Sequence, residues 1–230
     1  ICCLIMMVVL ATVVVVYAQE NKSVEIKSII FTDINNGWAI AKQRFSYEYK
    51  ETGVVLYTTD GGKNWNDWIS PDSTYHYRES SQSIYFLKDG RTGWISSEAG
   101  LFKTTDGGKS WKQLNYIAPT IYSSEFKLDR PECLRSIFFA DANIGWALAG
   151  LDIFETTSAH DVLKTIDGGK IWKSCFQSNG IELSEITSMF FLDAKYGWIL
   201  GANHWGGGGE IKNYKTVDGG KTWIELDGEQ

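Results

Sequence analysis

Positive charge is scarce in this 230-residue chain. It carries 22 lysines and arginines against 28 aspartates and glutamates, for a formal net charge of −6, and only five of the basic residues are arginines. Nucleic acids and anionic membrane surfaces are bound by clustered lysines and arginines, so this balance argues against both kinds of partner. The sequence therefore predicts no nucleic-acid ligand.

Sustained helical periodicity is absent as well. Short apolar runs alternate with turn residues along the whole chain, a pattern typical of strands and not of helices. With 43% hydrophobic and 14% aromatic residues, the chain has enough apolar surface to bury a core. We expect a globular, all-β protein.

Residues 1–18 contain no charged side chain and end in Val16-Tyr17-Ala18, ahead of Gln19. An apolar run with small residues at its end is typical of a secretory signal peptide. The run also has about the length that a bilayer requires, so an uncleaved anchor is the alternative and the only membrane contact expected. Because Ile1 is not Met and no positive charge precedes the run, we expect this signal to be incomplete at its N-terminus. In either case residues 19–230 are predicted to be secreted, periplasmic or on the cell surface.

A two-part phrase recurs four times in the remainder. Its first part ends in Gly-Trp, at tryptophans 56, 52 and 52 residues apart, and its second part is T-x-D-G-G-K-x-W. Self-similarity at a fixed period of this length predicts a solenoid, a propeller or an array. The Gly-Trp tryptophans are Trp38, Trp94, Trp146 and Trp198, and the second parts span Thr58–Trp65, Thr104–Trp111, Thr165–Trp172 and Thr216–Trp223.

Each repeat is predicted to form four short antiparallel strands. In the third repeat, one hairpin is expected over residues 134–149 and a second over residues 161–174, each closed by a turn of Asp, Asn or Gly. The sequence therefore predicts a β-propeller in residues 19–230, since a plain sandwich gives no reason for one turn to recur four times. The four blades are expected at about 24–70, 83–116, 134–176 and 186–226.

The T-x-D-G-G-K-x-W turn has a structural explanation. An Asp side chain can accept hydrogen bonds from backbone N–H groups of its own turn, and glycine supplies the positive φ that other residues resist. The tryptophan that follows can pack its ring between blades. Four copies of one aspartate in a repeat indicate a structural role and not a catalytic one. The residues assigned to it are Asp60, Gly62, Trp65, Asp106, Gly108, Trp111, Asp167, Gly169, Trp172, Asp218, Gly220 and Trp223.

On these residues the chain resembles the Asp-box, or BNR, repeat, whose pattern S/T-x-D-x-G-x-x-W all four copies match. Together with the preceding F-x-D-x-x-x-G-W phrase, it looks most like the photosystem II stability and assembly factor family of propellers. The resemblance covers Val24 to Leu226. Members of that family usually have more than four blades, so it implies part of a six- or seven-bladed ring. A closed four-bladed ring is the alternative.

The resemblance implies a non-catalytic propeller that binds a protein partner or acts as an assembly scaffold, without a cofactor. The family's photosystem role is associated with a basic, arginine-lined surface, which this acidic chain does not share. A general scaffold or cell-surface role fits the charge better. Asp-box propellers also occur in sialidases and xyloglucanases, so a glycoside hydrolase is the alternative function.

Binding residues are expected in the loops on the face opposite the Asp-box turns, because these loops vary between repeats and a rigid scaffold holds them. No H-E-x-x-H or similar spacing joins the three histidines of the chain, so no metal site is predicted. Trp205, followed by four glycines, could meet a partner peptide or a surface glycan, or fold back on its blade. The candidates are Tyr75, His76, Arg78, His160, Asp161, His204 and Trp205.

Two cysteines, Cys133 and Cys175, lie outside the predicted signal, before the first and after the last strand of the third repeat. Three strand spacings of about 4.8 Å place those strands about 14 Å apart. A disulfide needs Cα atoms within about 7 Å of each other, so a bridge would require the flanking loops to fold back. The sequence leaves their redox state open.

Overall fold

The computed structural model describes residues 22–45, 51–68, 81–97, 100–118, 133–150, 161–177, 185–203 and 210–226. These residues form four antiparallel sheets of four strands each, and within each sheet the strands follow one another in chain order. No described residue is helical. The prediction of an all-β propeller built from four-stranded antiparallel blades is confirmed.

We number the sheets as blades in chain order. Blade 1 contains β1 (Lys22–Phe31), β2 (Gly37–Phe45), β3 (Glu51–Thr58) and β4 (Asn66–Trp68). Blade 2 contains β5 (Ser81–Phe86), β6 (Gly93–Ser97), β7 (Gly100–Thr104) and β8 (Lys112–Leu114). Blade 3 contains β9 (Cys133–Phe139), β10 (Gly145–Gly150), β11 (Asp161–Thr165) and β12 (Trp172–Gln177). Blade 4 contains β13 (Glu185–Phe191), β14 (Gly197–Asn203), β15 (Glu210–Thr216) and β16 (Ile224–Leu226).

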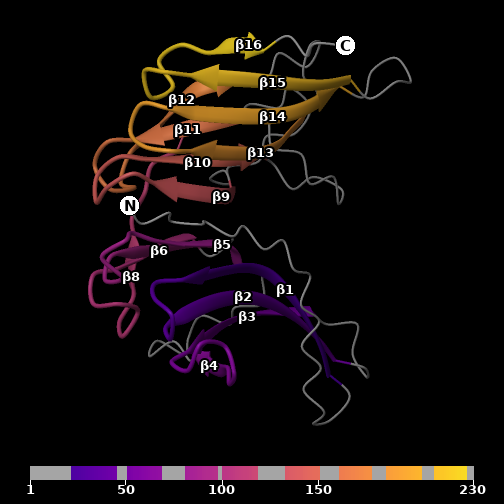
Figure 1. Ribbon diagram of the computed structural model, residues 1–230, viewed down its shortest axis with the longest axis vertical. Coiled ribbons are helices and arrows are strands. Elements are labelled where there is room, and N and C mark those ends of the chain that lie inside the picture. Colours follow the sequence, from indigo (N-terminus) through magenta and orange to yellow (C-terminus); the bar gives the residue numbers. More distant parts are fainter. Residues whose placement is uncertain are drawn as a thin grey trace, which may run out of the picture.

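The blades follow one another along the long axis of the molecule, from blade 1 in indigo at one end to blade 4 in yellow at the other (Figure 1). Each Gly-Trp tryptophan of blades 1 to 3 points at the next blade and meets the phenylalanine that ends that blade's first strand. Offset or parallel ring contacts of this kind add about 0.5–1.5 kcal/mol beyond the burial of apolar area. The pairs are Trp38–Phe86, Trp94–Phe139 and Trp146–Phe191, with centroids 5.8, 3.6 and 3.9 Å apart.

Polar contacts reinforce the junction between blades 2 and 3 and the junction between blades 3 and 4. The indole N–H of Trp94 donates to the Gly168 carbonyl at 3.1 Å, and that of Trp146 donates to the Gly219 carbonyl at 3.2 Å. A lysine on the neighbouring strand lies over each indole ring, Lys103 at 4.7 Å and Lys164 at 5.1 Å from the centroid. Blades 2 and 3 are thus each joined to the Asp-box turn of the blade that follows.

The Asp-box turn is closed by its own side chains. In blade 2, the Thr104 hydroxyl donates to Asp106 at 2.8 Å and accepts the Gly108 N–H at 2.9 Å, while Asp106 accepts the Ser110 N–H at 2.9 Å. The other three blades repeat this pattern. The Gly107 N–H donates to the Arg91 carbonyl at 2.9 Å, which ties the turn to the Asp-to-Gly-Trp turn of the same blade. Both turns therefore lie at one end of each blade, as expected.

These hydrogen bonds also fix the charge of the aspartates. The pKa of Asp106 is lowered to about 2, first by the Ser110 side chain and then by the backbone N–H of Ser110. The pKa of Asp60 and that of Asp218 are also lowered to about 2, mainly by hydrogen bonds from Asn64 and Thr222. A carboxylate that is ionised throughout the neutral range cannot serve as a proton donor there.

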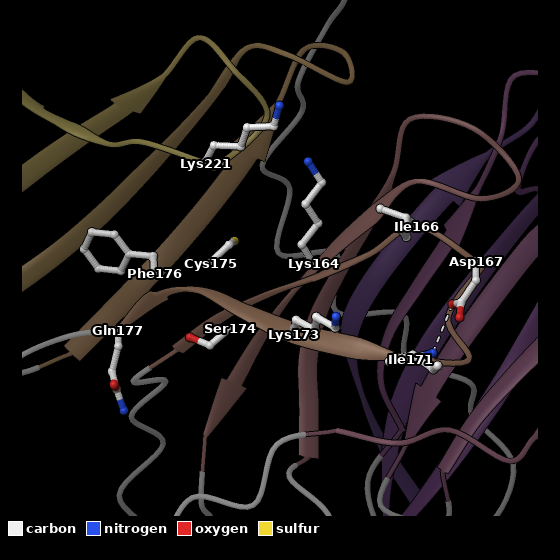
Figure 2. Close-up of a pocket in the computed structure, with 11 residues that line it drawn as sticks. Lys164, Ile166, Asp167, Ile171, Lys173, Ser174, Cys175, Phe176, Gln177 and Lys221 are labelled. Atoms are coloured by element: carbon white, nitrogen blue, oxygen red, sulfur yellow. Dashed lines mark hydrogen bonds between the residues drawn. The ribbon is translucent and has the colours of Figure 1, made fainter.

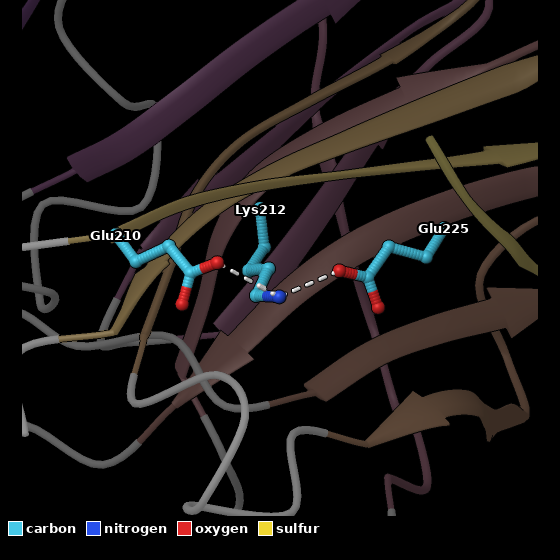
Figure 3. A network of polar contacts seen from close by, with 3 residues as sticks. All are labelled: Glu210, Lys212 and Glu225. Atoms are coloured by element: carbon cyan, nitrogen blue, oxygen red, sulfur yellow. Dashed lines mark hydrogen bonds and ion pairs between the residues drawn. The ribbon is translucent and has the colours of Figure 1, made fainter. Parts of the chain in front are cut away.

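The outer edge of blade 4 carries an ion network (Figure 3). Lys212 on β15 lies between Glu210 and Glu225, with Nζ 3.1 Å and 2.7 Å from their carboxylate oxygens. The hydrogen bond to Glu225, and then that to Glu210, raises the pKa of Lys212. This network links the short strand β16 to β15.

Candidate binding groove between blades 3 and 4

Most of the residues expected to bind a ligand lie outside the described residues. These are Tyr75, His76, Arg78, His160, His204 and Trp205. Asp161 is described: it is the first residue of β11, it is only 3% exposed, and its Oδ1 has no hydrogen-bond partner within the part of the chain that the structure describes. The sequence predicted Asp161 at the start of this strand, at the margin of a variable loop, and the structure places it there with its carboxyl buried.

Burial raises the pKa of Asp161 to about 6, from an ordinary value of 3.8. The folded protein therefore binds one more proton than the unfolded chain between about pH 4 and pH 6, and its stability falls as pH rises through this window. We expect wild type to lose about 2–3 kcal/mol of unfolding free energy between about pH 4 and pH 7 relative to Asp161→Asn, since one pKa unit corresponds to about 1.4 kcal/mol. Urea unfolding of both proteins across this range checks the prediction. Parallel pH profiles for the two proteins would contradict it.

A groove of about 840 Å³ lies between blade 3 and the Asp-box turn of blade 4 (Figure 2). Three lysines line it: Lys164 on β11, Lys173 on β12 and Lys221 in the blade 4 turn. Ile166, Ile171 and Phe176 contribute apolar side chains to its wall. The remaining lining residues are Asp167, Ser174, Cys175, Gln177 and Gly220. The groove is therefore cationic and partly apolar, on a protein whose net charge is negative.

The lysines differ in how they are held. Lys164 is half-buried, and its Nζ donates to the Gly219 carbonyl at 2.6 Å. Burial lowers the pKa of Lys164, and the positive charge of Lys221 lowers it further, while Cys175 acts in the opposite direction. Lys173 and Lys221 are exposed, so their ammonium groups are accessible to a ligand.

Two other groups in the groove are unavailable for chemistry. Asp167 accepts hydrogen bonds from the N–H groups of Lys170 and Ile171, each at 3.0 Å, so its carboxylate serves the turn. Cys175 is a free thiol whose pKa burial raises to about 12, which leaves it protonated and weakly nucleophilic at neutral pH. Neither the Asp167 carboxylate nor the Cys175 thiol is therefore free to react with a ligand in the groove.

A second groove, of about 960 Å³, lies between blades 1 and 2. Trp38 and Tyr57 line it, with ring centroids 5.7 Å apart. Tyr57 stands directly before the T-x-D motif, at the position that Lys103, Lys164 and Lys215 occupy in the other blades. Comparing the residue before each T-x-D would have singled out this junction, and it would equally have found Lys164. Lys173 directly follows the Asp-box tryptophan Trp172, at a position where the four repeats share no common residue.

Metal-ligand clusters and membrane-spanning helices are absent from the described ranges. These ranges contain no group of three or more His, Cys, Asp or Glu side chains that could hold a metal ion. The same ranges include no helix of the length and apolar character needed to span a bilayer.

No family model matches the chain. A photosystem II assembly lipoprotein, Ycf48 of Synechococcus sp. (strain CC9902), is 28% identical over 149 residues, which are 64% of this chain and 35% of the relative. The match thus spans little more than a third of the relative's length. Among solved structures, an ancestral GH74 enzyme gives a TM-score of 0.56 at 14% identity. The match covers 88% of this chain and 25% of the GH74 chain. A structure of YCF48 bound to a D1 peptide gives a TM-score of 0.47 at 17% identity, and the match covers 95% of this chain and 88% of the YCF48 chain.

The chain is a β-propeller of four-stranded antiparallel blades. Within that class it is a distant homologue of the Ycf48-like photosystem II assembly factors.

Proposed function

We propose that this chain is a non-catalytic scaffold, located outside the cytoplasm, that binds an acidic and partly apolar segment of a protein partner. The groove between blades 3 and 4 is the observation that carries this proposal. Its exposed Lys173 and Lys221 supply positive charge beside the apolar side chains of Ile171 and Phe176. Charge complementarity of this kind favours carboxylates and steers their approach.

The sequence relative supports a role in protein assembly, because its name describes a lipoprotein that assembles photosystem II. The apolar, uncharged run of residues 1–18 supports the location. For this chain we propose a partner other than a photosystem, because its surface is acidic and poor in arginine. The lysines of the groove between blades 3 and 4, which we call the lysine groove, then account for recognition of an acidic partner without an arginine-lined surface.

Binding of a labelled synthetic peptide tests the proposal. The probe is an acetylated, amidated peptide that alternates aspartate with leucine, and a peptide that alternates lysine with leucine is its counterpart. We expect the acidic peptide to bind, and the double variant Lys173→Glu/Lys221→Glu to weaken its binding at least about tenfold by fluorescence anisotropy, because both exposed cations reverse sign. Lys63→Glu/Lys109→Glu is the matched control, since it reverses the same number of charges at exposed lysines that hold the motif position of Lys221 in blades 1 and 2. Equal binding of both peptides, or equal weakening by the control variant, would refute binding at the groove between blades 3 and 4.

A glycoside hydrolase is the second candidate function, and Asp161 is the observation that favours it. A carboxyl whose pKa is raised to about 6 has the property that a glycosidase proton donor requires. The scaffold proposal instead expects no turnover of sialyl or β-glucan substrates. Turnover that Asp161→Asn abolishes would overturn the scaffold proposal.

A further inference from the structure

A lysine ammonium group occupies the same place in two junctions of the propeller. Between blades 3 and 4, Lys164 lies over the ring of Trp146, and its Nζ donates to the Gly219 carbonyl at 2.6 Å. Between blades 2 and 3, Lys103 lies over the Gly-Trp tryptophan of its own blade and donates to the Ala142 carbonyl at 3.1 Å. Each ammonium group is thus bound by an indole ring and by a carbonyl from a turn of the next blade.

The groove between blades 1 and 2 contains the same acceptors, but the chain supplies no lysine to them. Gly90 and Gly107 hold in blade 2 the motif positions of the two acceptor residues. Both glycines line the groove together with Trp38. Within the part of the chain that the structure describes, neither glycine carbonyl accepts a hydrogen bond. Two backbone acceptors and an indole ring therefore line one groove, and these are the groups that hold an ammonium ion in the other two junctions.

Tyr57 stands in blade 1 where the other three blades carry a lysine. Its ring is tilted by 36° against that of Trp38, with centroids 5.7 Å apart, and it carries no positive charge. Trp38 remains 7% exposed, whereas Trp94 and Trp146 have no exposed surface. No lysine or arginine among the described residues lies over the Trp38 ring. The ring surface that a lysine covers in the other junctions is therefore accessible to a ligand here.

The charges around this groove favour a cation. Hydrogen bonds within the turns, led in each case by the residue three or four positions further along, lower the pKa of all three aspartates that line it, so they stay ionised at neutral pH. The positive charge of Arg91 acts on one of these carboxylates, Asp89, whose pKa it also lowers. The charged lining residues are Asp33, Asp89 and Asp106 against Arg91 and Lys109. The groove thus has one more negative than positive group, unlike the lysine groove.

We propose that the groove between blades 1 and 2 binds a primary ammonium group, such as the one that ends a lysine side chain of another molecule. The ammonium group lies against the ring of Trp38, beside Tyr57, and donates to the carbonyls of Gly90 and Gly107. A ligand thereby makes from outside the contact that lysines of blades 2 and 3 make from within the chain. An ammonium ion has three N–H donors, so it can satisfy both carbonyls while its charge faces the indole.

A ligand series on the wild-type protein tests this site. Nα-acetyl-lysine methylamide is titrated and its binding followed by saturation-transfer NMR, and we expect a dissociation constant of about 1 mM for so small a ligand. The Nε-acetylated form has no charge, and the Nε-trimethylated form keeps the charge but has no N–H to donate. Both are expected to bind at least about tenfold more weakly, because charge and hydrogen bonds are both required. Equal binding of the trimethylated form would mean that the rings alone hold the cation, and would overturn the proposal.

Tyr57→Lys tests where the ligand binds. This variant supplies blade 1 with the lysine that the other blades carry, so we expect its own ammonium group to occupy the site and to weaken binding of the lysine ligand at least about tenfold. Tyr57→Met is the matched control, because it removes the same ring without adding a charge, and we expect it to weaken binding no more than about threefold. Circular dichroism confirms that both variants are folded, and the ligand series on wild type stands without them.

Three results would each count against this site: no binding to wild type, undiminished binding to Tyr57→Lys, or equal weakening by Tyr57→Met. Lys173→Glu/Lys221→Glu is expected to leave binding of the lysine ligand unchanged, because neither lysine lines the groove between blades 1 and 2. The two sites can therefore fail separately. A site with a dissociation constant of about 1 mM stays largely empty at the micromolar concentrations of an anisotropy measurement, so it does not obscure the comparison of the acidic and basic peptides.

Discussion

Trp146→Ala is expected to lower the free energy of unfolding by about 3–5 kcal/mol, the usual cost of removing a fully buried tryptophan. Trp146 has no exposed surface, stacks on Phe191 with centroids 3.9 Å apart, and donates to the Gly219 carbonyl. Its removal leaves a cavity between blades 3 and 4 and takes away one of the two hydrogen bonds that the Gly219 carbonyl accepts, the other coming from Lys164. Lys164 also loses the ring beneath it. Chemical denaturation monitored by circular dichroism measures the change.

Trp198→Ala is the matched control for that experiment. It removes the same residue from the same motif, but at a position that is only partly buried, so we expect a smaller loss of about 1–2 kcal/mol. Equal losses in the two variants would mean that stacking between blades contributes little to the stability of the propeller. The difference between the two variants isolates the contribution of the junction.

Gly108→Ala is expected to cost about 2–5 kcal/mol, for two reasons that add. Gly108 has φ of 83°, a conformation that costs an L-residue about 1–2 kcal/mol. In addition, a Cβ at Gly108 would overlap the six-membered ring of Trp38, which is held between Phe86 and Trp111. Overpacking of this kind typically costs about 1–3 kcal/mol. Thermal and urea unfolding of the variant check the prediction.

Gly62→Ala separates the two costs. Gly62 occupies the same motif position in blade 1 with φ of 87°, but a Cβ there meets its nearest atom, on the Phe31 ring, at an ordinary 3.4 Å. We therefore expect Gly62→Ala to show the conformational cost alone, about 1–2 kcal/mol. If Gly108→Ala were no worse than Gly62→Ala, Trp38 would have to move aside without cost.

Much of the fold could be predicted from the sequence, because its information is local and repeated. Thr104, Asp106 and Gly108 lie within five residues of one another and close their turn without help from the rest of the chain. Strand alternation around such turns then predicts four-stranded blades. The candidate binding residues could be predicted less well. The sequence places Asp161 at the junction of a variable loop and a strand, but it gives no sign that the carboxyl is buried. The lysine groove was missed because Lys173 and Lys221 belong to different blades, and no sequence pattern links residues across a junction.

The sequence by itself determined the repeating blade, the turn that closes it and the distant kinship with Ycf48-like propellers, since all three depend on short motifs. Only the tertiary structure decided what each copy of a motif does. Trp146 and Trp198 occupy the same place in the same phrase, yet Trp146 is fully buried against Phe191 and Trp198 is only partly buried. The physical reason is that burial is a property of the surface that arrives from the neighbouring blade. A repeated sequence specifies its own blade identically each time, while its position in the series decides which neighbour covers it.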